Sequence, residues 1–367
     1  MIVTEIFLQN WRNITELKIL PEDDINIFLG ENAQGKTNIL ESINYASLLR
    51  SRAVKESDLI RWGQDNALIR ITFSKMGVRH ELAIEISESR PRRMLLDANP
   101  IRPRDLLGKL NSVLFAPEDL LMFKGSPALR RKFLDAQISQ ASPLYFIELT
   151  RYTRLVEQRN NLLKRIREGQ ADINELDLWD EQLSLANATI LSKRIAAVKK
   201  LKVLADYMQK EISAQRENLL VEYKMKGLTS YKNIATNFYD LLTTRRSKDV
   251  ERGYTSVGAQ YDDLRFLLNG QELKQFGSQG QIRTATLAMK LSELQFIKSE
   301  TGEFPLLLLD DVMSELDSSR RELLLNFLRR EKIQTVITAT EKSYFPPHSF
   351  GKFFFVESGK IVREVSP

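Results

Sequence analysis

The feature that most constrains the fold of this chain is the segment Gly30-Glu31-Asn32-Ala33-Gln34-Gly35-Lys36-Thr37. It fits the phosphate-binding pattern G-x-x-x-x-G-K-[ST], and it follows the apolar run 25–29, which is typical of a buried strand. The two glycines let the backbone turn so that successive N–H groups face inward. Together with the start of a helix near Lys36, these groups form a cradle for phosphate oxygens. The sequence therefore predicts a nucleotide-binding strand, loop and helix.

Four side chains in two distant segments have the chemistry that a bound ATP requires. We expect Lys36 to reach the β- and γ-phosphates, and Thr37 to supply a hydroxyl for the Mg²⁺ that bridges them. The run 304–309 is a short apolar strand that ends in Asp310 and Asp311. This strand would aim Asp310 at the Mg²⁺, while Asp311 reaches the position from which a water attacks the γ-phosphate. A simple turn after an apolar strand is the alternative for the two carboxylates.

Two further loops suit a bound nucleotide. The turn of an expected opening hairpin contains Arg12 and Asn13, which are candidates for contact with the base or the phosphates. An ordinary exposed turn is the alternative there. The loop Ser278-Gln279-Gly280-Gln281 precedes an expected helix through residues 285–294, and backbone N–H groups at the start of a helix favour anions.

Length and composition narrow the class of protein. A chain of 367 residues is too long for one ordinary core, so we expect two domains or one domain with a large insertion. The absence of cysteine excludes disulfides and thiolate metal sites, and the two histidines, His80 and His348, disfavour a histidine-based site. Neither a signal peptide nor a long apolar run is visible, so we expect a soluble cytoplasmic protein without a membrane partner. The net charge of +6 favours a polyanionic partner without establishing one.

The middle of the chain is charged and helical. Between Tyr145 and Lys226 the apolar residues step by three and four, and residues 169–174 read as the connection of an antiparallel helical hairpin. The returning helix carries a cluster of basic residues, which are Lys193, Arg194, Lys199, Lys200 and Lys202. A charged coiled-coil exterior and a DNA-facing surface both fit this cluster. Upstream, residues 115–127 break regular structure, and the following cations 130–132 form either a solvated face or an anion site.

The order of these parts resembles the SMC-like branch of the ABC ATPases, although the hairpin is far shorter than the arms of SMC proteins. Within that branch the whole chain resembles the RecF family. The first set of residues that carries this resemblance is Pro117-Glu118-Asp119, Gly125-Ser126-Pro127, Arg130, Arg131, Phe133 and Asp135. The second set is Leu309-Asp310-Asp311 with Ser314-Glu315-Leu316-Asp317.

The resemblance implies an α/β fold, in which an ABC-type P-loop ATPase head of mixed sheets and helices carries an inserted α-helical hairpin domain. Residues 1–115 would form the N-terminal part of the head, residues 116–252 the helical arm, and residues 253–367 the C-terminal part of the head. The chain departs from the family pattern at Gly258-Ala259-Gln260-Tyr261-Asp262-Asp263, where RecF sequences commonly carry Gly-Pro-His-Arg-Asp-Asp. A role of that histidine and arginine therefore does not transfer to this chain.

The resemblance also implies an ATP-dependent homodimer. Ser278, Gly280 and Gln281 of one subunit would close over the γ-phosphate held by the other, and Asp317 would lie along the dimer seam. Catalysis would rest on Lys36, Asp311, Ser278 and Gln281. The segment 338–340 stands where many ABC ATPases have a switch histidine, so we expect slow hydrolysis that serves as a switch.

The family further implies binding to double-stranded DNA near junctions with single strands, in gap repair and replication restart. The implied protein partners are RecR and RecO, which together load RecA. An architectural DNA-tethering ATPase of the SMC type and a transporter ATPase are the alternatives. The short hairpin disfavours the first, and the inserted hairpin with its DNA-repair pattern disfavours the second.

Overall fold

The structure is a computed structural model that describes residues 1–49, 55–228, 230, 232–346 and 351–366. Its contacts divide the chain into two compact units. The first unit contains Met1–Leu120, Leu204–Asn218 and Ser278–Pro367, and the second contains Leu121–Val203 and Leu219–Gly277. The domain boundaries expected from the sequence, at residues 115 and 252, differ from the boundaries of these two units. The expected domains stay a prediction. His348 and Arg50, the expected end of the first helix, lie outside the described residues.

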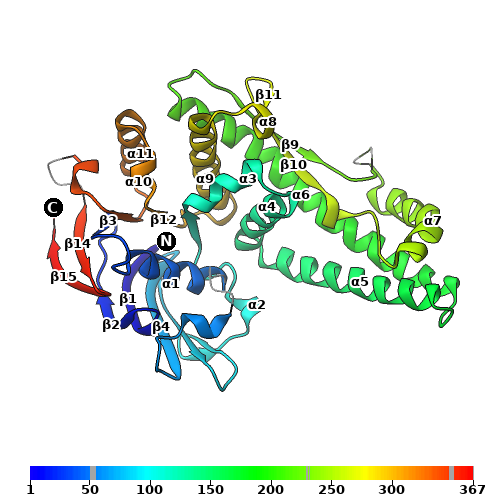
Figure 1. The fold of residues 1–367 in the computed structure, drawn as a ribbon, viewed down its shortest axis with the longest axis horizontal. Helices are drawn as coiled ribbons and strands as arrows, with labels where there is room; N and C mark the ends of the chain where they lie inside the picture. Colours follow the sequence, from blue (N-terminus) through cyan, green and yellow to red (C-terminus); the bar gives the residue numbers. More distant parts are fainter. Residues whose placement is uncertain (50–54, 229, 231, 347–350, 367) are drawn as a thin grey trace. The chain divides into compact units, whose positions relative to one another are not determined.

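An antiparallel sheet with the strand order β2-β1-β4-β5-β6-β7 forms one layer of the first unit (Figure 1). Its strands are β1 (Ile2–Trp11), β2 (Ile14–Ile19), β4 (Asn66–Lys75), β5 (Val78–Ser87), β6 (Arg93–Leu96) and β7 (Asn99–Pro100). Every second side chain of β5 from Leu82 to Ile86 is apolar and buried, so one face of the sheet covers the core. The expected opening hairpin and the strand cluster 66–97 are both confirmed.

The second sheet of this unit has the strand order β15-β14-β3-β13-β12-β8. Its strands are β3 (Ile25–Leu29), β8 (Ser112–Phe115), β12 (Leu306–Asp310), β13 (Thr335–Ala339), β14 (Lys352–Glu357) and β15 (Lys360–Val365). All except β15 run parallel to their neighbours. Every residue of β3, β12 and β13 is buried, as is typical of parallel strands that are covered on both faces. Because parallel strands end at the same edge, the loops after β3, β12 and β13 emerge together.

Helices complete the first unit. They are α1 (Lys36–Leu48), α2 (Pro103–Leu106), α9 (Gln279–Thr301), α10 (Val312–Glu315) and α11 (Ser318–Glu331), with single turns η1 (Glu56–Leu59), η2 (Pro117–Leu120) and η5 (Lys342–Tyr344). The main core of this unit includes Trp11, Ile39 and Ile43 together with apolar side chains of both sheets. Helix α1 therefore packs its apolar face against the sheets and points its first turn at the phosphate loop.

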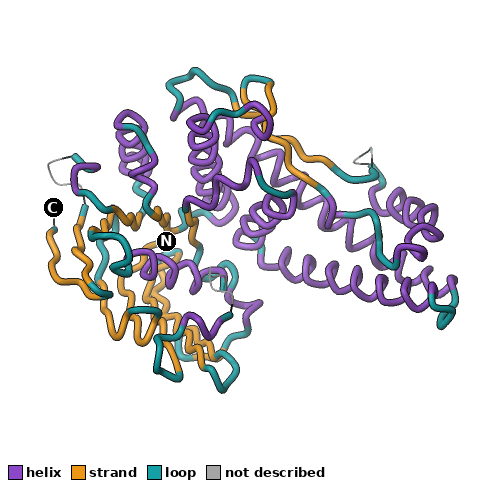
Figure 2. The backbone as a smooth tube through the Cα atoms, viewed as in Figure 1, coloured by secondary structure: helices purple, strands orange, loops and turns teal. Residues whose placement is uncertain are grey.

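The second unit is mainly helical, as the purple segments of Figure 2 show. Its helices are α3 (Leu121–Lys124), α4 (Pro127–Ala141), α5 (Pro143–Arg167), most of α6 (Leu176–Ile212), α7 (Ile234–Arg252) and α8 (Leu273–Phe276), with single turns η3 (Ile173–Glu175) and η4 (Ala259–Tyr261). A small antiparallel sheet has the order β11-β10-β9, from β9 (Leu219–Lys224), β10 (Asp263–Leu268) and β11 (Gln271–Glu272). The expected helical hairpin is confirmed as α5 and α6, joined by residues 168–175.

Buried ion pairs join the elements of the second unit. Arg194 on α6 donates to both carboxylate oxygens of Asp135 on α4 at 2.9 Å, and to the carbonyl oxygen of Ala259 at 2.7 Å. Asp135 also accepts a hydrogen bond of 2.6 Å from the hydroxyl of Tyr145. Arg194 is only 2% exposed. This residue of the expected basic surface is therefore part of the interior, because its charge is matched there.

The cations 130–132 do not form one surface. The Arg130 guanidinium pairs with both carboxylate oxygens of Asp263 at 2.6 and 2.9 Å, and it donates to the carbonyl oxygens of Met122 and Gly125. Arg131 donates to the carbonyl oxygen of Asp262 at 2.8 Å. The expectation of a solvated face or an anion site is thus wrong for Arg130, which is buried and joins the start of α4 to β10.

Several regular elements were not predicted from the sequence. Residues 219–224, which we expected to be helical, form β9, because their alternating apolar side chains pair with β10. Residues 115–127, expected to lack regular structure, contain the end of β8, which is a parallel neighbour of β12, then the turn η2 and the short helix α3. Helix α7 was not predicted. Within the described residues, none of the helices combines the length and the apolarity that crossing a membrane demands.

Replacing Arg194 by alanine should destabilise the second unit by about 3–5 kcal/mol, because Asp135 would remain buried without its partner. Hydrogen exchange of the α4 and α6 amides would locate the loss, and urea unfolding would measure it. Lys193→Ala, at the exposed neighbouring position, is the matched control and should change stability by less than about 0.5 kcal/mol. Equal effects of the two substitutions would contradict the prediction.

Candidate functional site

The phosphate loop occupies the turn between β3 and α1, and its backbone requires glycine at two positions. A Cβ atom on Gly30 would lie 2.4 Å from the carbonyl oxygen of Val356, and one on Gly35 would lie 2.8 Å from the side chain of Asn13. Gly35 also has a φ of 105°, in the region that favours glycine. The loop thus lies directly against β14 and against the turn after β1. Its residues Glu31, Asn32 and Ala33 are exposed.

Lys36 lies folded over this loop. Its Nζ donates hydrogen bonds to the carbonyl oxygens of Gly30 at 2.7 Å and Glu31 at 2.6 Å, and the residue is 7% exposed. Burial lowers the pKa of Lys36, while the negative charges of Asp311 and Asp310 oppose this shift. Carbonyl oxygens compensate a buried ammonium only partly, so the loop favours an anionic ligand beside Lys36.

Three polar side chains meet where β12, β13 and α1 approach one another. Thr37 Oγ1 donates to Asp310 Oδ1 at 2.8 Å, and Thr338 Oγ1 donates to the same oxygen at 3.0 Å. The backbone N–H of Asp311 donates in turn to Thr338 Oγ1 at 2.9 Å. The arrangement places a hydroxyl and a carboxylate side by side at the edge of the parallel sheet.

This pair of oxygen ligands fits a magnesium ion. Mg²⁺ commonly takes one or two protein oxygens and completes its octahedron with phosphate oxygens and waters. In the part of the chain that the structure describes, no three acidic, histidine or cysteine side chains gather into a metal site. The sparse donor set of Thr37 and Asp310 therefore suits a metal that arrives with a nucleotide.

The backbone conformation and the surroundings of Asp311 are typical of a catalytic residue. It caps α10 with a φ of 54°, a left-handed conformation that costs an aspartate some strain and that concentrates at functional sites. Its Oδ1 is buried without a hydrogen-bond partner. Burial raises the pKa of Asp311, Lys36 lowers it, and Asp310 raises it further. An unsatisfied carboxylate oxygen beside the phosphate loop is suited to accept a proton or to hold a water.

Arg12 and Asn13 support the loop from the side. The Arg12 guanidinium pairs with both carboxylate oxygens of Glu41 on α1 at 3.0 Å and donates to the carbonyl oxygen of Asp58. Asn13 accepts a hydrogen bond from Asn38 at 2.8 Å. Both residues lie next to the phosphate loop, as the sequence predicts. The Arg12 guanidinium, however, is hydrogen-bonded to Glu41 and Asp58 of the chain itself.

The C-terminal hairpin also supports the loop, which the sequence did not reveal. Gln34 Oε1 accepts a hydrogen bond of 2.6 Å from the N–H of Ser358, and its carbonyl oxygen accepts one of 2.8 Å from Gly359. An open recess beside this contact is lined by Leu29, Gly30, Glu31, Gln34, Phe355, Val356, Glu357 and Ser358. The contact spans 324 residues of chain, so no local signal predicts it.

The loop Ser278–Gln281 caps α9. Ser278 Oγ accepts from the N–H of Gln281 at 3.2 Å, and Gln281 Oε1 accepts from the N–H of Ser278 at 3.0 Å, which is a reciprocal capping box. A Cβ on Gly280 would meet no atom within 4 Å, so open space surrounds this backbone. Among the described residues, no hydrogen bond or ion pair joins Ser278, Gly280 or Gln281 to the phosphate loop.

Asp317 caps α11 and faces its own helix. Its carboxylate accepts from the N–H of Arg320 at 2.9 Å, from Ser319 Oγ at 2.7 Å and from Arg320 Nη1 at 2.8 Å. These hydrogen bonds lower the pKa of Asp317. The structure thus brings Lys36, Thr37, Asp310 and Asp311 together, while Asp317 and the loop Ser278–Gln281 have other partners.

Comparison with known proteins finds relatives that match this chain over almost its whole length. The family profile described as "RecF/RecN/SMC N terminal domain" matches residues 2–357. The "DNA replication and repair protein RecF" of Halothermothrix orenii is 40% identical over 377 residues, covering 99% of both chains. The protein with the same description from Clostridium tetani is 40% identical and covers 99% of this chain and 100% of the relative.

Solved structures point to the same family and show the same fold. The structure described as "the recombination mediator protein RecF-ATP in RecFOR pathway" superposes with a TM-score of 0.90 at 34% identity, covering 100% of this chain and 98% of the other. The head domain of an Smc protein from Pyrococcus furiosus gives a TM-score of 0.60 at 13% identity, covering 100% of this chain and 96% of that one, and so shares the fold. The expected fold, an ABC-type ATPase head with an inserted helical hairpin, is confirmed.

Asp311→Asn should raise the stability of the protein without nucleotide at pH 7, because ionised Asp311 is desolvated and lies near Asp310. A raised folded-state pKa means that the cost appears as the pH rises above the unfolded value of 3.8 and is complete above the folded value. The gain in melting temperature over wild type should therefore vanish below about pH 3.8. A gain that stays constant with pH would contradict this assignment, and Asp317→Asn, whose pKa is lowered, should instead destabilise at pH 7.

Proposed function

This chain belongs to the RecF family, and we propose that it is an ATP-dependent, DNA-binding recombination mediator that acts in single-strand gap repair and replication restart. The observation that carries the proposal is the convergence of Lys36, Thr37, Asp310 and Asp311 at one edge of the parallel sheet. It supplies a cation, a hydroxyl and two carboxylates where a nucleoside triphosphate requires them. The description of the solved relative as a complex with ATP supports the same ligand.

In this proposal the residues of the loop bind and orient ATP. The N–H groups at the start of α1 and the ammonium of Lys36 hold the phosphate oxygens, replacing the carbonyl oxygens of Gly30 and Glu31 as partners of Nζ. Thr37 and Asp310 hold Mg²⁺, which neutralises phosphate charge when bound. Asp311 orients the attacking water and accepts its proton through the oxygen that lacks a partner.

The second half of each site comes from another copy of the chain. Within the described residues, no hydrogen bond or ion pair joins Ser278, Gly280 or Gln281 to the phosphate loop of their own subunit, and open space surrounds the Gly280 backbone. Closing this loop over the γ-phosphate of a partner gives ATP contacts that exist only in the dimer, so ATP shifts the equilibrium toward association. Asp317 then lies along the seam.

Hydrolysis is slow and acts as a switch for release. The next-to-last residue of β13 is Thr338, whose hydroxyl donates to Asp310 and accepts from the N–H of Asp311, so this position supplies no titrating group. A proton must leave through Asp311 alone, and its short side chain gives the water less support than a glutamate would. We therefore propose weak, DNA-stimulated turnover.

Double-stranded DNA, near junctions with single strands, is the proposed nucleic-acid ligand. The net charge of +6 supports a polyanionic partner, and Lys193, Lys199 and Lys202 remain exposed on α6 after Arg194 is assigned to the interior. The pathway named with the solved relative, RecFOR, supports RecR and RecO as partners in the loading of RecA. The site of action is then the cytoplasm, at the nucleoid.

The architectural alternative, a DNA-tethering ATPase of the SMC type, needs long arms. Helix α5 has 25 residues, which is about 38 Å at 1.5 Å per residue. Such a hairpin is a small domain rather than an arm that encloses a ring. The structure therefore favours the mediator over the tether.

Lys36→Arg should bind ATP with nearly the wild-type affinity but lower kcat by about 10- to 100-fold, because the guanidinium keeps the charge and misplaces it at the γ-phosphate. Equilibrium binding of a fluorescent ATP analogue and steady-state hydrolysis, each with duplex DNA present, measure the two effects. The exposed Lys199→Arg is the control and should match wild type in both assays. Wild-type turnover of many ATP molecules per second on DNA would contradict the switch.

Ser278→Arg should leave ATP binding intact and abolish ATP-dependent dimerisation, because the larger cation blocks the close approach of Ser278 to a partner's γ-phosphate. Sedimentation with and without ATP and duplex DNA measures dimerisation and DNA binding together. Ser299→Arg, at the exposed far end of α9, is the matched control and should dimerise normally. Dimerisation of the Ser278 variant with ATP would show the trans site to be wrong.

A further inference from the structure

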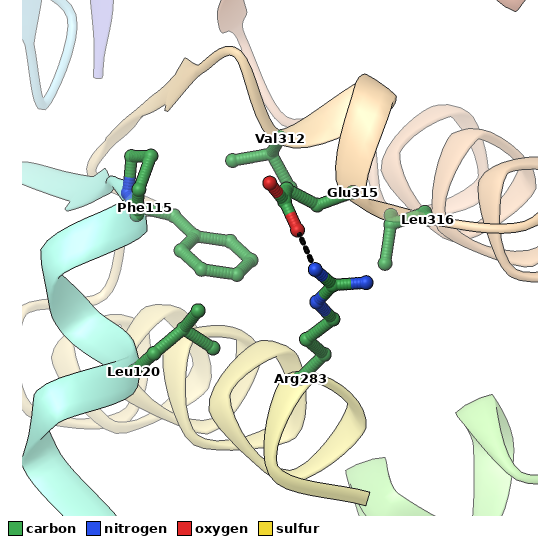
Figure 3. A pocket seen from close by; sticks show the side chains of 7 residues that line it. Phe115, Leu120, Arg283, Val312, Glu315 and Leu316 are labelled. Carbon is green, nitrogen blue, oxygen red and sulfur yellow. Dashed lines mark ion pairs between the residues drawn. The ribbon is translucent and has the colours of Figure 1, made fainter. Parts of the chain in front are cut away.

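An ion pair links the helix of the Ser278 loop to the segment that follows Asp311. Arg283 lies in the second turn of α9, and its Nη2 is 2.5 Å from Glu315 Oε2 at the end of α10 (Figure 3). The two side chains reach toward each other from separate helices, as the dashed line in Figure 3 marks. The pair thus connects two segments to which the proposed function gives different tasks.

Apolar side chains line the recess beside the pair. The recess beneath it is lined by Phe115, Pro117, Leu120, Val312 and Leu316, together with the two charged residues (Figure 3). Because the other lining residues are apolar, the guanidinium and the carboxylate are the only charged groups in this lining. The pair therefore bridges α9 and α10.

Helix α10 begins directly after Asp311. It has only four residues, Asp311 is its N-cap, and Ser314 Oγ donates to the carbonyl oxygen of Asp311 at 2.8 Å. A helix of one turn has no length over which to absorb a displacement, so moving Glu315 moves Asp311. The strained φ of 54° at Asp311 makes its side-chain direction dependent on such support.

We propose that Arg283 is a positioning residue, which couples the Ser278 loop that senses the partner's γ-phosphate to Asp311, the base for the subunit's own ATP. The inference rests on the proposed function. Each subunit contributes to two composite sites, its Ser278 loop to one and its Asp311 to the other. Closure of one site then aligns the base in the second through Arg283 and Glu315.

The pair acts on geometry more than on stability. The Arg283 and Glu315 side chains are 42% and 37% exposed, and an ion pair of that exposure contributes little to folding. Breaking it should therefore leave a folded protein that binds ATP. The expected defect lies in kcat, since only the alignment of Asp311 is lost.

Charge reversal and exchange test the coupling in the full chain. Arg283→Glu and Glu315→Arg should each lower kcat for ATP by about tenfold, with KM within about threefold of wild type and with ATP-dependent sedimentation unchanged. The double variant Arg283→Glu with Glu315→Arg restores opposite charges and should recover most of kcat. A role confined to folding would change stability and not give this split or this rescue.

The chain offers a matched control on the same helix. Lys298 of α9 lies 3.7 Å from Glu331 of α11, and its side chain is also 42% exposed. Lys298→Glu and Glu331→Lys should leave kcat unchanged. Single variants at 283 and 315 with wild-type kcat, or a double variant without recovery, would overturn the coupling. Absence of ATP hydrolysis in the wild type would instead overturn the proposed function.

Discussion

The hydrogen bonds that Asp310 accepts from Thr37 and Thr338 hold the first unit together at its functional edge. They join α1, β12 and β13, and the partners Thr37 and Asp310 are 273 residues apart in the chain. The parallel sheet makes the meeting possible, because its strands are buried on both faces and end at one edge. A hydrogen bond to a charged group contributes about 1.5–3 kcal/mol, so the same contacts that prepare a metal site also stabilise the fold.

Buried charged residues also join elements in other parts of the structure. Several of them belong to the residue pattern that identifies the RecF family. Asp119 of that pattern lies 3.1 Å from Lys290, a buried lysine of α9 that also pairs with Glu293 at 3.4 Å. Burial raises the pKa of Glu293 to about 7, with Lys290 opposing the shift. In the second unit, the buried residues Arg130 and Asp135 of the pattern each form an ion pair. These pattern residues therefore position helices, since an unmatched charge in the interior would be costly.

The segment 258–263, which departs from the usual RecF pattern, forms contacts with both of these ion pairs. Its backbone carbonyl at Ala259 accepts from Arg194, and its final carboxylate, Asp263, pairs with Arg130. The side chain of Gln260 accepts from the hydroxyl of Tyr152, and Tyr261 lies under the ammonium of Lys226 at 4.4 Å. The segment is therefore held by its backbone, by Asp263 and by the side chains of Gln260 and Tyr261, which stand where the usual family pattern has histidine and arginine.

The sequence by itself determined the phosphate loop, the carboxylates after β12, the capped start of α9 and the helical hairpin, because each depends on residues close together in the chain and on a fixed periodicity. Only the tertiary structure decided which charges are interior, as for Arg130 and Arg194, and that residues 219–224 form a strand rather than a helix. It also decided that the C-terminal hairpin supports Gln34 and that Arg283 meets Glu315. These outcomes depend on partners brought from distant parts of the chain, and burial and pairing between such partners leave no periodic signal in either segment alone.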